Sequence, residues 1–454
     1  MDEIDDRQQQ AGAAEQIAAT AAAEVRRQRV ELIIVLEKHD EFHLRTRNKI
    51  DELVQQFLTI RGMVSDSEVP DDDHNDDDAA ERRRQRVKLI SILKQNDPRT
   101  RNKIDESVEA FLTRTEDDIH DMFCNNNVYD DDDDDDDVDL DSDRDTEAEV
   151  ETALRFFPEV LSRRGGRCNK YPIQYLATRC KAVSFIPLVA RLALEFGLFE
   201  EKERGGLLLE DECGDNMLQF LVNDFFIDHH VDDMINREDV DDMYLNVMIQ
   251  LRQVGYFNRE DIQKYGLVLV LCRCRVVSEK RFRFLVEWDP TSLIKTEERT
   301  GNLPIHFAMK SFPTIMKSFS TIQDFRIVFE YGIRYYPKRK GISLLFKKNH
   351  FNIPHLHIIC RTFKSEDVMK VVEDILIRYS DTPINTTEAL ITAAIDEDIY
   401  LDCVYFLLRR EPDILQKLLS SKQATVTAMT INGSTNEATS NNCDSEKLKR
   451  KRGI

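Results

Sequence analysis

The stretch GNLPIHFA, residues 301–308, decides how the second half of the chain is interpreted. It places His306 two residues after Pro304. Proline is favoured at the first position of a helix, because its fixed φ suits the turn and no helical hydrogen bond is lost. The apolar residues behind Pro304 then predict a short buried helix. The histidine either performs chemistry or holds this helix in place, and the surrounding sequence decides between the two.

Weaker copies of this pattern occur elsewhere in the chain. KYPIQYLA carries Pro172, and NIPHLHII carries Pro354 and His357. DNMLQFLV has Met217 where the other copies have proline, and Leu267 is a further anchor. Amphipathic stretches with helical spacing lie between the anchors, over residues 185–196, 243–254, 325–336 and 368–379. Because successive anchors are 37 to 50 residues apart, we expect an all-α fold built as an α-solenoid of stacked helical hairpins.

The stretch 301–308 resembles the opening of an ankyrin repeat, G-x-T-P-L-H-x-A. The residues that match are Gly301, Pro304, His306 and Ala308, with Ile305 in place of leucine. Leu303 stands where the family has threonine, so the usual hydroxyl cap of the helix is absent.

The resemblance implies a structural role for the histidine. In ankyrin repeats the tetrapeptide starts the first helix, and the histidine forms a local hydrogen bond that ties neighbouring turns together. Gln174 and Gln219 stand at the histidine position in two other units, and the spacing exceeds the family's ~33 residues. Residues 151–420 therefore look like a degenerate ankyrin-like array, similar to the repeat families expanded in unicellular algae such as diatoms.

The first part of the chain contains an internal duplication. Residues 26–62 and 83–117 are similar, and residues 45–51 and 99–105 are identical. Each copy has the spacing of an amphipathic helix preceded by a second helix. The apolar stripes consist of Ile50, Leu53, Val54, Phe57 and Leu58 in one copy, and of Ile104, Val108, Phe111 and Leu112 in the other. One hairpin cannot bury its stripe alone, so we expect pairing within one chain or between two.

The net charge of −22 is concentrated in two segments. Residues 66–81 and 116–151 together carry −27, which leaves +5 for the rest of the chain. Eight consecutive aspartates occupy residues 130–137. Because such segments repel themselves and have few apolar residues, we expect disordered linkers there. They are either spacers or an acidic surface for a basic partner.

These features predict seven segments. In order, they are a flexible N-terminus (1–19), a first helical unit (20–65), an acidic linker (66–81), a second helical unit (82–115), an Asp-rich linker (116–150), the array (151–420) and a disordered tail (421–454).

No motif predicts catalysis, a cofactor or a metal. His350, His355, His357 and Cys360 have metal-binding side chains but not the convergence that zinc requires. Glycine loops for phosphate and the usual hydrolase or kinase motifs are also missing. We therefore expect a protein that is not an enzyme.

Two groups of basic residues are candidate binding sites. One could form a patch where the loops of a solenoid align, and it consists of Arg163, Arg164, Arg167, Lys170, Arg334, Lys338, Arg339, Lys340, Lys347 and Lys348. The other is a candidate nuclear signal, made of Lys447, Lys449, Arg450, Lys451 and Arg452.

Composition places the protein inside the cell. Nine scattered cysteines indicate reduced thiols, and residues 1–10 lack the apolar core of a signal peptide. No apolar run approaches the ~20 residues of a membrane span. We expect a soluble cytoplasmic or nuclear protein with no membrane partner.

Two functions fit this organisation. The first is a non-enzymatic scaffold whose array binds an unidentified protein, with N-terminal helices that mediate self-association. The alternative is a nuclear factor associated with nucleic acid or chromatin, in which basic loops contact phosphate and Asp runs contact basic proteins.

Overall fold

The protein is mostly helical in the part that the computed structural model describes. This part comprises residues 20, 23–60, 75–95, 101–124, 140–166, 168–223, 237–274, 276–308, 322–336, 342–345, 349–351, 359–360, 363–379, 409 and 416. No strand occurs among these residues, which confirms the all-α expectation. None of their helices is both long and apolar enough to cross a membrane.

The chain divides into two compact units. Unit 1 comprises Met1–Glu297 and Lys310–Asp324, and unit 2 comprises Glu298–Met309 and Phe325–Ile454.

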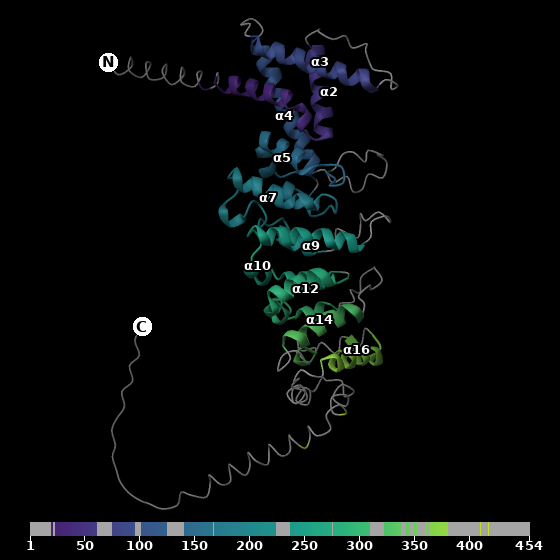
Figure 1. Cartoon of the computed structure of the whole chain (residues 1–454). Helices are drawn as coiled ribbons and strands as arrows, with labels where there is room; N and C mark the ends of the chain where they lie inside the picture. The colour runs from purple at the N-terminus through teal and green to yellow at the C-terminus, as the bar shows by residue number, and fades with distance from the viewer. Residues whose placement is uncertain are drawn as a thin grey trace, which may run out of the picture. The chain divides into compact units, whose positions relative to one another are not determined.

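Unit 1 begins with an N-terminal module of paired helices (Figure 1). A helix over residues 23–37 is followed by η1 (His39–Glu41) and α2 (Leu44–Ile60), and then by α3 (Asn75–Lys94) and α4 (Arg101–Cys124). α2 packs against both α3 and α4. All nine residues of the two apolar stripes are buried, and each large side chain contributes roughly 1.5–3 kcal/mol by leaving water. The two hairpins therefore pair within one chain.

The two copies of the duplication are joined crosswise. Arg29 and Arg86 hold equivalent positions in the two copies, as do Asp51 and Asp105. Arg29 pairs with Asp105 of the other copy, and Arg86 pairs with Asp51 at 2.5 Å. Glu37 and its equivalent, Lys94, meet at 2.9 Å. Contacts that are reciprocal in this way are those of an approximate two-fold axis, as in an isologous dimer.

The expected linkers are shorter than their acidity suggested. α3 begins at Asn75, inside the expected linker 66–81, and α4 continues to Cys124, inside the expected linker 116–150. The reason is that Ile119, Met122 and Phe123 extend the apolar stripe of α4 and are fully buried. The aspartate run at residues 130–137 lies outside the described residues.

The rest of unit 1 consists of helices stacked in chain order (Figure 1). They are α5 (Glu147–Phe156), η2 (Pro158–Ser162), α6 (Pro172–Leu176), η3 (Val183–Phe185), α7 (Ile186–Glu195), η4 (Glu201–Glu203), α8 (Met217–Val222), α9 (Arg237–Gln253), α10 (Arg259–Lys264), α11 (Leu267–Arg273), α12 (Glu279–Trp288) and η6 (Pro290–Ile294). The long helices α5, α7, α9 and α12 pack in succession, and so do the short helices α6, α8 and α11.

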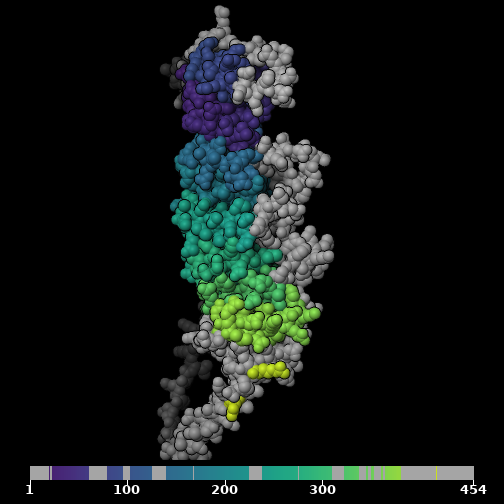
Figure 2. Space-filling model, turned by 45° about the vertical axis from the view of Figure 1, so that its right-hand side comes forward, coloured from purple at the N-terminus to yellow at the C-terminus, as the bar shows by residue number. Residues whose placement is uncertain are grey.

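The N-terminal module packs directly on this stack. α4 contacts α6 and η2, and η1 contacts α5. In the space-filling view, the module (purple and dark blue) and the helices that follow it (blue to teal) form one continuous surface (Figure 2).

Unit 2 contains α13 (Pro304–Phe307), most of α14 (Ile322–Tyr335), η7 (Ile342–Leu345) and α16 (Ser365–Arg378). Phe325 and Phe329 stack one turn apart on α14 and are fully buried. Arg378 of α16 pairs with Glu330 of α14 at 2.6 Å.

Candidate interaction site

The repeat motifs use their polar side chains to start helices. His306 is buried, and its Nδ1 accepts a hydrogen bond of 2.9 Å from the Leu303 backbone N–H. Gln174 accepts the equivalent bond from the Tyr171 N–H at 3.0 Å. Gln219 accepts it from the Asn216 N–H at 2.9 Å. Each bond satisfies a backbone donor at a helix start. The three side chains therefore occupy the same structural position in three helices.

The other motif residues in the described part are also structural. Pro172 and Pro304 are the first residues of α6 and α13, and Ile305 and Ala308 are buried. Gly301 has φ +67°, in the left-handed region that favours glycine. Pro354 and His357 lie outside the described residues.

We expect Gly301→Ala to destabilise unit 2. An added Cβ would lie 2.3 Å from the His350 ring, in addition to the strain of a positive φ. Gly197→Ala is the matched control, because Gly197 has φ +68° and open space where a Cβ would lie. Thermal unfolding of the two variants separates the clash from the strain. An equal decrease in melting temperature would show that the Gly301–His350 contact is unimportant.

A buried Cys–His pair lies where α4 ends. The Sγ of Cys124 is 3.5 Å from Nε2 of His120, which in turn is 3.1 Å from the Arg163 carbonyl oxygen. Burial raises the pKa of the Cys124 thiol to about 12. A nucleophilic cysteine needs a lowered pKa instead. The thiol therefore stays protonated at neutral pH, and the pair is a packing contact.

The described part of the predicted basic patch is already engaged within the chain. Arg163 pairs with Asp117 at 2.8 Å, and Lys170, largely buried, pairs with Asp211 at 3.5 Å. Arg164 lies 4.4 Å above the Tyr171 ring. Less positive charge is free here than the sequence suggests.

The remaining basic candidates are only partly described. Arg334 lies 5.7 Å from the centre of the Tyr331 ring. The other residues fall outside the described part of the chain, and they are Arg167, Lys338, Arg339, Lys340, Lys347, Lys348, Lys447, Lys449, Arg450, Lys451 and Arg452.

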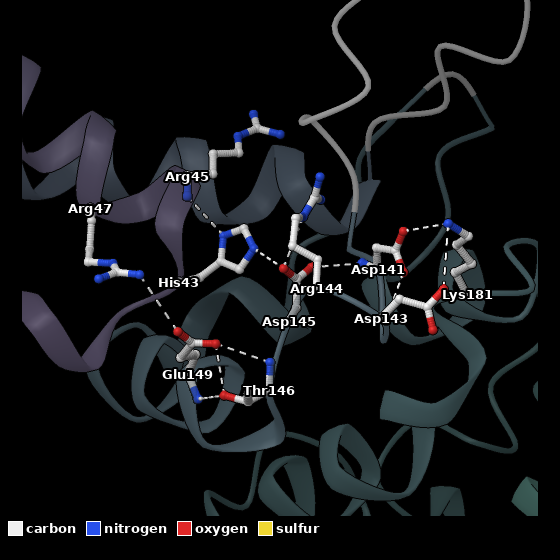
Figure 3. Close-up of polar contacts among 10 residues, drawn as sticks. All are labelled: His43, Arg45, Arg47, Asp141, Asp143, Arg144, Asp145, Thr146, Glu149 and Lys181. Carbon is white, nitrogen blue, oxygen red and sulfur yellow. Dashed lines mark hydrogen bonds and ion pairs between the residues drawn. The ribbon is translucent and has the colours of Figure 1, made fainter. Parts of the chain in front are cut away.

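A polar joint anchors the segment that follows the aspartate run (Figure 3). His43, just before α2, contacts Asp145 at 2.5 Å, and their side chains are 3% and 1% exposed. The carboxylate of Asp145 also accepts a hydrogen bond of 2.7 Å from the Asp141 backbone N–H. Lys181 pairs with Asp141 at 2.8 Å. The joint therefore connects the N-terminal module to the loop before α7.

We expect this joint to lose strength in acid. Burial raises the pKa of Asp145, but hydrogen bonds from His43 and from the Asp141 N–H outweigh burial and hold the pKa below its ordinary 3.8. A depressed carboxyl pKa adds stability above the ordinary pKa, and this stability is lost as the pH falls through the folded-state value. The melting temperatures of wild type and Asp145→Asn should therefore converge below pH ~4. A constant difference from pH 7 to pH 3 would contradict this role.

A cleft of about 470 Å³ opens where the N-terminal module meets the stack. Helix 23–37, α4, and the junction of α5 with η2 form its walls. Its lining residues are Arg27, Gln28, Glu31, Glu109, Leu112, Thr113, Glu116, Arg155, Phe156, Phe157, Pro158 and Glu159. The cleft combines an apolar wall with four carboxylates and two arginines. This composition suits a ligand that carries both apolar and charged groups.

Comparisons with known proteins give no relative for this chain. No family model, no curated protein and no solved structure matches it. Within the described residues, no group of three or more His, Cys, Asp or Glu side chains is arranged to hold a metal ion.

Proposed function

We propose that the chain is a non-enzymatic scaffold for protein–protein interaction, built on an ankyrin-like α-solenoid of helical hairpins. The observation that carries the proposal is the open cleft between the N-terminal module and the stack, whose polar groups are partly unused by the fold. By contrast, His306, Gln174 and Gln219 are committed to helix starts, and Cys124 is protonated. These four side chains are therefore used by the fold, and the cleft is the surface on which the proposal rests.

The location of the cleft also supports this function. It is formed by three elements that are distant in the sequence, so it exists only when the module and the stack are packed together. Repeat arrays bind partners on surfaces that neighbouring units build jointly. The described arginines and lysines of the basic patch are less available, because Arg163 and Lys170 pair with carboxylates of the same chain. This favours the scaffold over the nucleic-acid factor.

Affinity capture with the full-length chain tests the proposal. The N-terminal module must be retained, because a fragment that starts at residue 151 would cut α5 and remove helix 23–37 and α4, two of the three walls of the cleft. We expect a defined protein to co-purify after nuclease treatment and to be retained in part at ~0.5 M salt, since apolar contacts are not screened. Recovery of nucleic acid alone, with steep loss at that salt, would favour the alternative function.

A further inference from the structure

The cleft has an apolar wall on one side. Leu112 and Phe157 are buried, and Phe156 and Pro158 are half-buried beside them. These side chains come from α4 and from the α5–η2 junction. They provide a surface on which an alkyl chain can pack.

The opposite character comes from four carboxylates in the same cleft. They belong to Glu31, Glu109, Glu116 and Glu159. Glu31 lies 3.5 Å from Arg27, and Glu116 lies 3.7 Å from Arg163. Among the described residues, Glu109 and Glu159 form no ion pair with any Lys or Arg side chain. The four carboxylates of the cleft therefore outnumber the two arginines, Arg27 and Arg163, that pair with them.

The two arginines of the cleft are held mainly by carboxylates outside it. Arg27 pairs with Glu24 at 2.7 Å, and Arg155 pairs at 2.7 Å with both Glu151 and Glu195. The positive charge of each arginine is thus neutralised largely by carboxylates that do not line the cleft. The cleft keeps an excess of negative charge.

We propose that this cleft binds a Lys- or Arg-rich segment of a partner protein. A basic side chain places its alkyl stem on Phe156 and Pro158 and its cationic head near Glu31 and Glu159. Long basic side chains combine these two contacts because their methylene stems pack on apolar surface while the charged end stays polar. The inference rests on the proposed scaffold function and names the chemistry of the partner segment.

The electrostatics of Glu31 agree with a cationic occupant. Burial raises the pKa of Glu31; Arg27 acts in the opposite direction, and the carboxylates of Glu24 and Glu116 add to the rise. A bound ammonium or guanidinium would stabilise the charged carboxylate, because an opposite charge within ~4–6 Å favours ionisation. A bare metal ion fits less well, since the apolar wall supplies no ligand.

Peptide binding to the full-length chain tests the proposal. The probe is a fluorescent decapeptide that alternates Lys or Arg with Leu, and its Glu-for-Lys counterpart is the control peptide. We expect fluorescence anisotropy at ~150 mM salt to show binding of the basic peptide only. Glu31→Gln combined with Glu159→Gln should weaken it about tenfold, since Glu31 is partly buried and its pairing with a cation exceeds the worth of an exposed pair.

A matched variant separates the cleft from general attraction to an acidic protein. Glu106→Gln with Glu201→Gln removes the same charge from exposed positions outside the cleft, and it should bind like wild type. Equal weakening in both variants, or no binding by wild type, would overturn the proposal.

One further experiment identifies whether the basic segment comes from a partner or from this chain. Deleting residues 447–452 should leave peptide affinity unchanged if the occupant comes from a partner. A tenfold gain in affinity would show that the chain's own basic segment fills the cleft, which would overturn the partner as the source. If affinity capture recovers a protein equally with wild type and the cleft variant, the scaffold function stands and the assignment of this cleft fails.

Discussion

Phe57→Asp combined with Phe111→Asp is expected to unfold the N-terminal module. Both rings are buried, one on α2 and one on α4, at equivalent positions of the duplication. Truncating a buried phenylalanine costs about 3–5 kcal/mol, and a buried carboxylate adds a further penalty. Two such losses reach the ~5–15 kcal/mol that stabilise a typical domain. Circular dichroism should show loss of helix, and limited proteolysis should cut within residues 23–124.

The control uses apolar residues that face solvent on the same two hairpins. Ile60 on α2 is 81% exposed and Val87 on α3 is 60% exposed. Ile60→Asp with Val87→Asp introduces the same two charges without burying them, and it should leave the helical signal and the proteolysis pattern unchanged. Full helicity in the Phe57/Phe111 variant would mean that the stripes do not hold the two hairpins together.

The same result bears on self-association. The sequence left open whether the stripes pair within one chain or between two. In the structure they are buried within one chain, so they are not free to join a second copy unless the hairpins exchange.

Periodicity predicted the helices of this fold well, because it reports which residues share one face. The stripe from Ile50 to Leu58 follows from spacing, and the helix starts at Pro172 and Pro304 follow from the preference of proline for the first helical position. Composition was a poorer guide to the linkers. Acidic residues surround Ile119, Met122 and Phe123, yet the apolar spacing of these three residues, rather than the surrounding charge, decides that α4 continues.

The polar joint and the cleft were beyond sequence reasoning for a different reason. His43 and Asp145 are 102 residues apart, and nothing in their local sequence indicates that they meet. The cleft needs three elements whose mutual packing is set by tertiary contacts. For the crosswise ion pairs of the N-terminal module, a weak signal did exist: an arginine and an aspartate recur at equivalent places in both copies of the duplication, which marks them as a structural pair.

That signal names the residues but not the pairing, and the pairing can be tested by charge reversal. Within one hairpin Arg29 would pair with Asp51, whereas the structure pairs Arg86 with Asp51 and Arg29 with Asp105. Asp51 is about nine-tenths buried. Burial raises its pKa, but hydrogen bonds from His39 and Arg86 outweigh burial, and the pKa is lowered. The carboxylate is therefore charged in the folded state and needs its cation.

We expect Asp51→Arg alone to cost roughly 3–5 kcal/mol, because it leaves two cations close together in a mostly buried place. Adding Arg86→Asp should restore most of the loss, since the pair is then re-formed with opposite polarity. Adding Arg29→Asp instead should not restore it, because that change also removes the partner of Asp105. Chemical denaturation of wild type, of these three variants and of Arg86→Asp and Arg29→Asp alone gives the free energies that the two double-mutant cycles require.

The comparison between the two double variants decides the topology of the module. Rescue by Arg86→Asp but not by Arg29→Asp is the outcome that crosswise pairing predicts. Rescue by Arg29→Asp alone would mean that each hairpin folds upon itself, and the approximate two-fold axis would then be wrong. Glu37 and Lys94 indicate which copies pair at this axis. In a pair of two first copies Glu37 would meet Glu37, and in a pair of two second copies Lys94 would meet Lys94, so like charges would lie together. Unlike charges at the axis therefore favour pairing of the two different copies over pairing of either copy with itself.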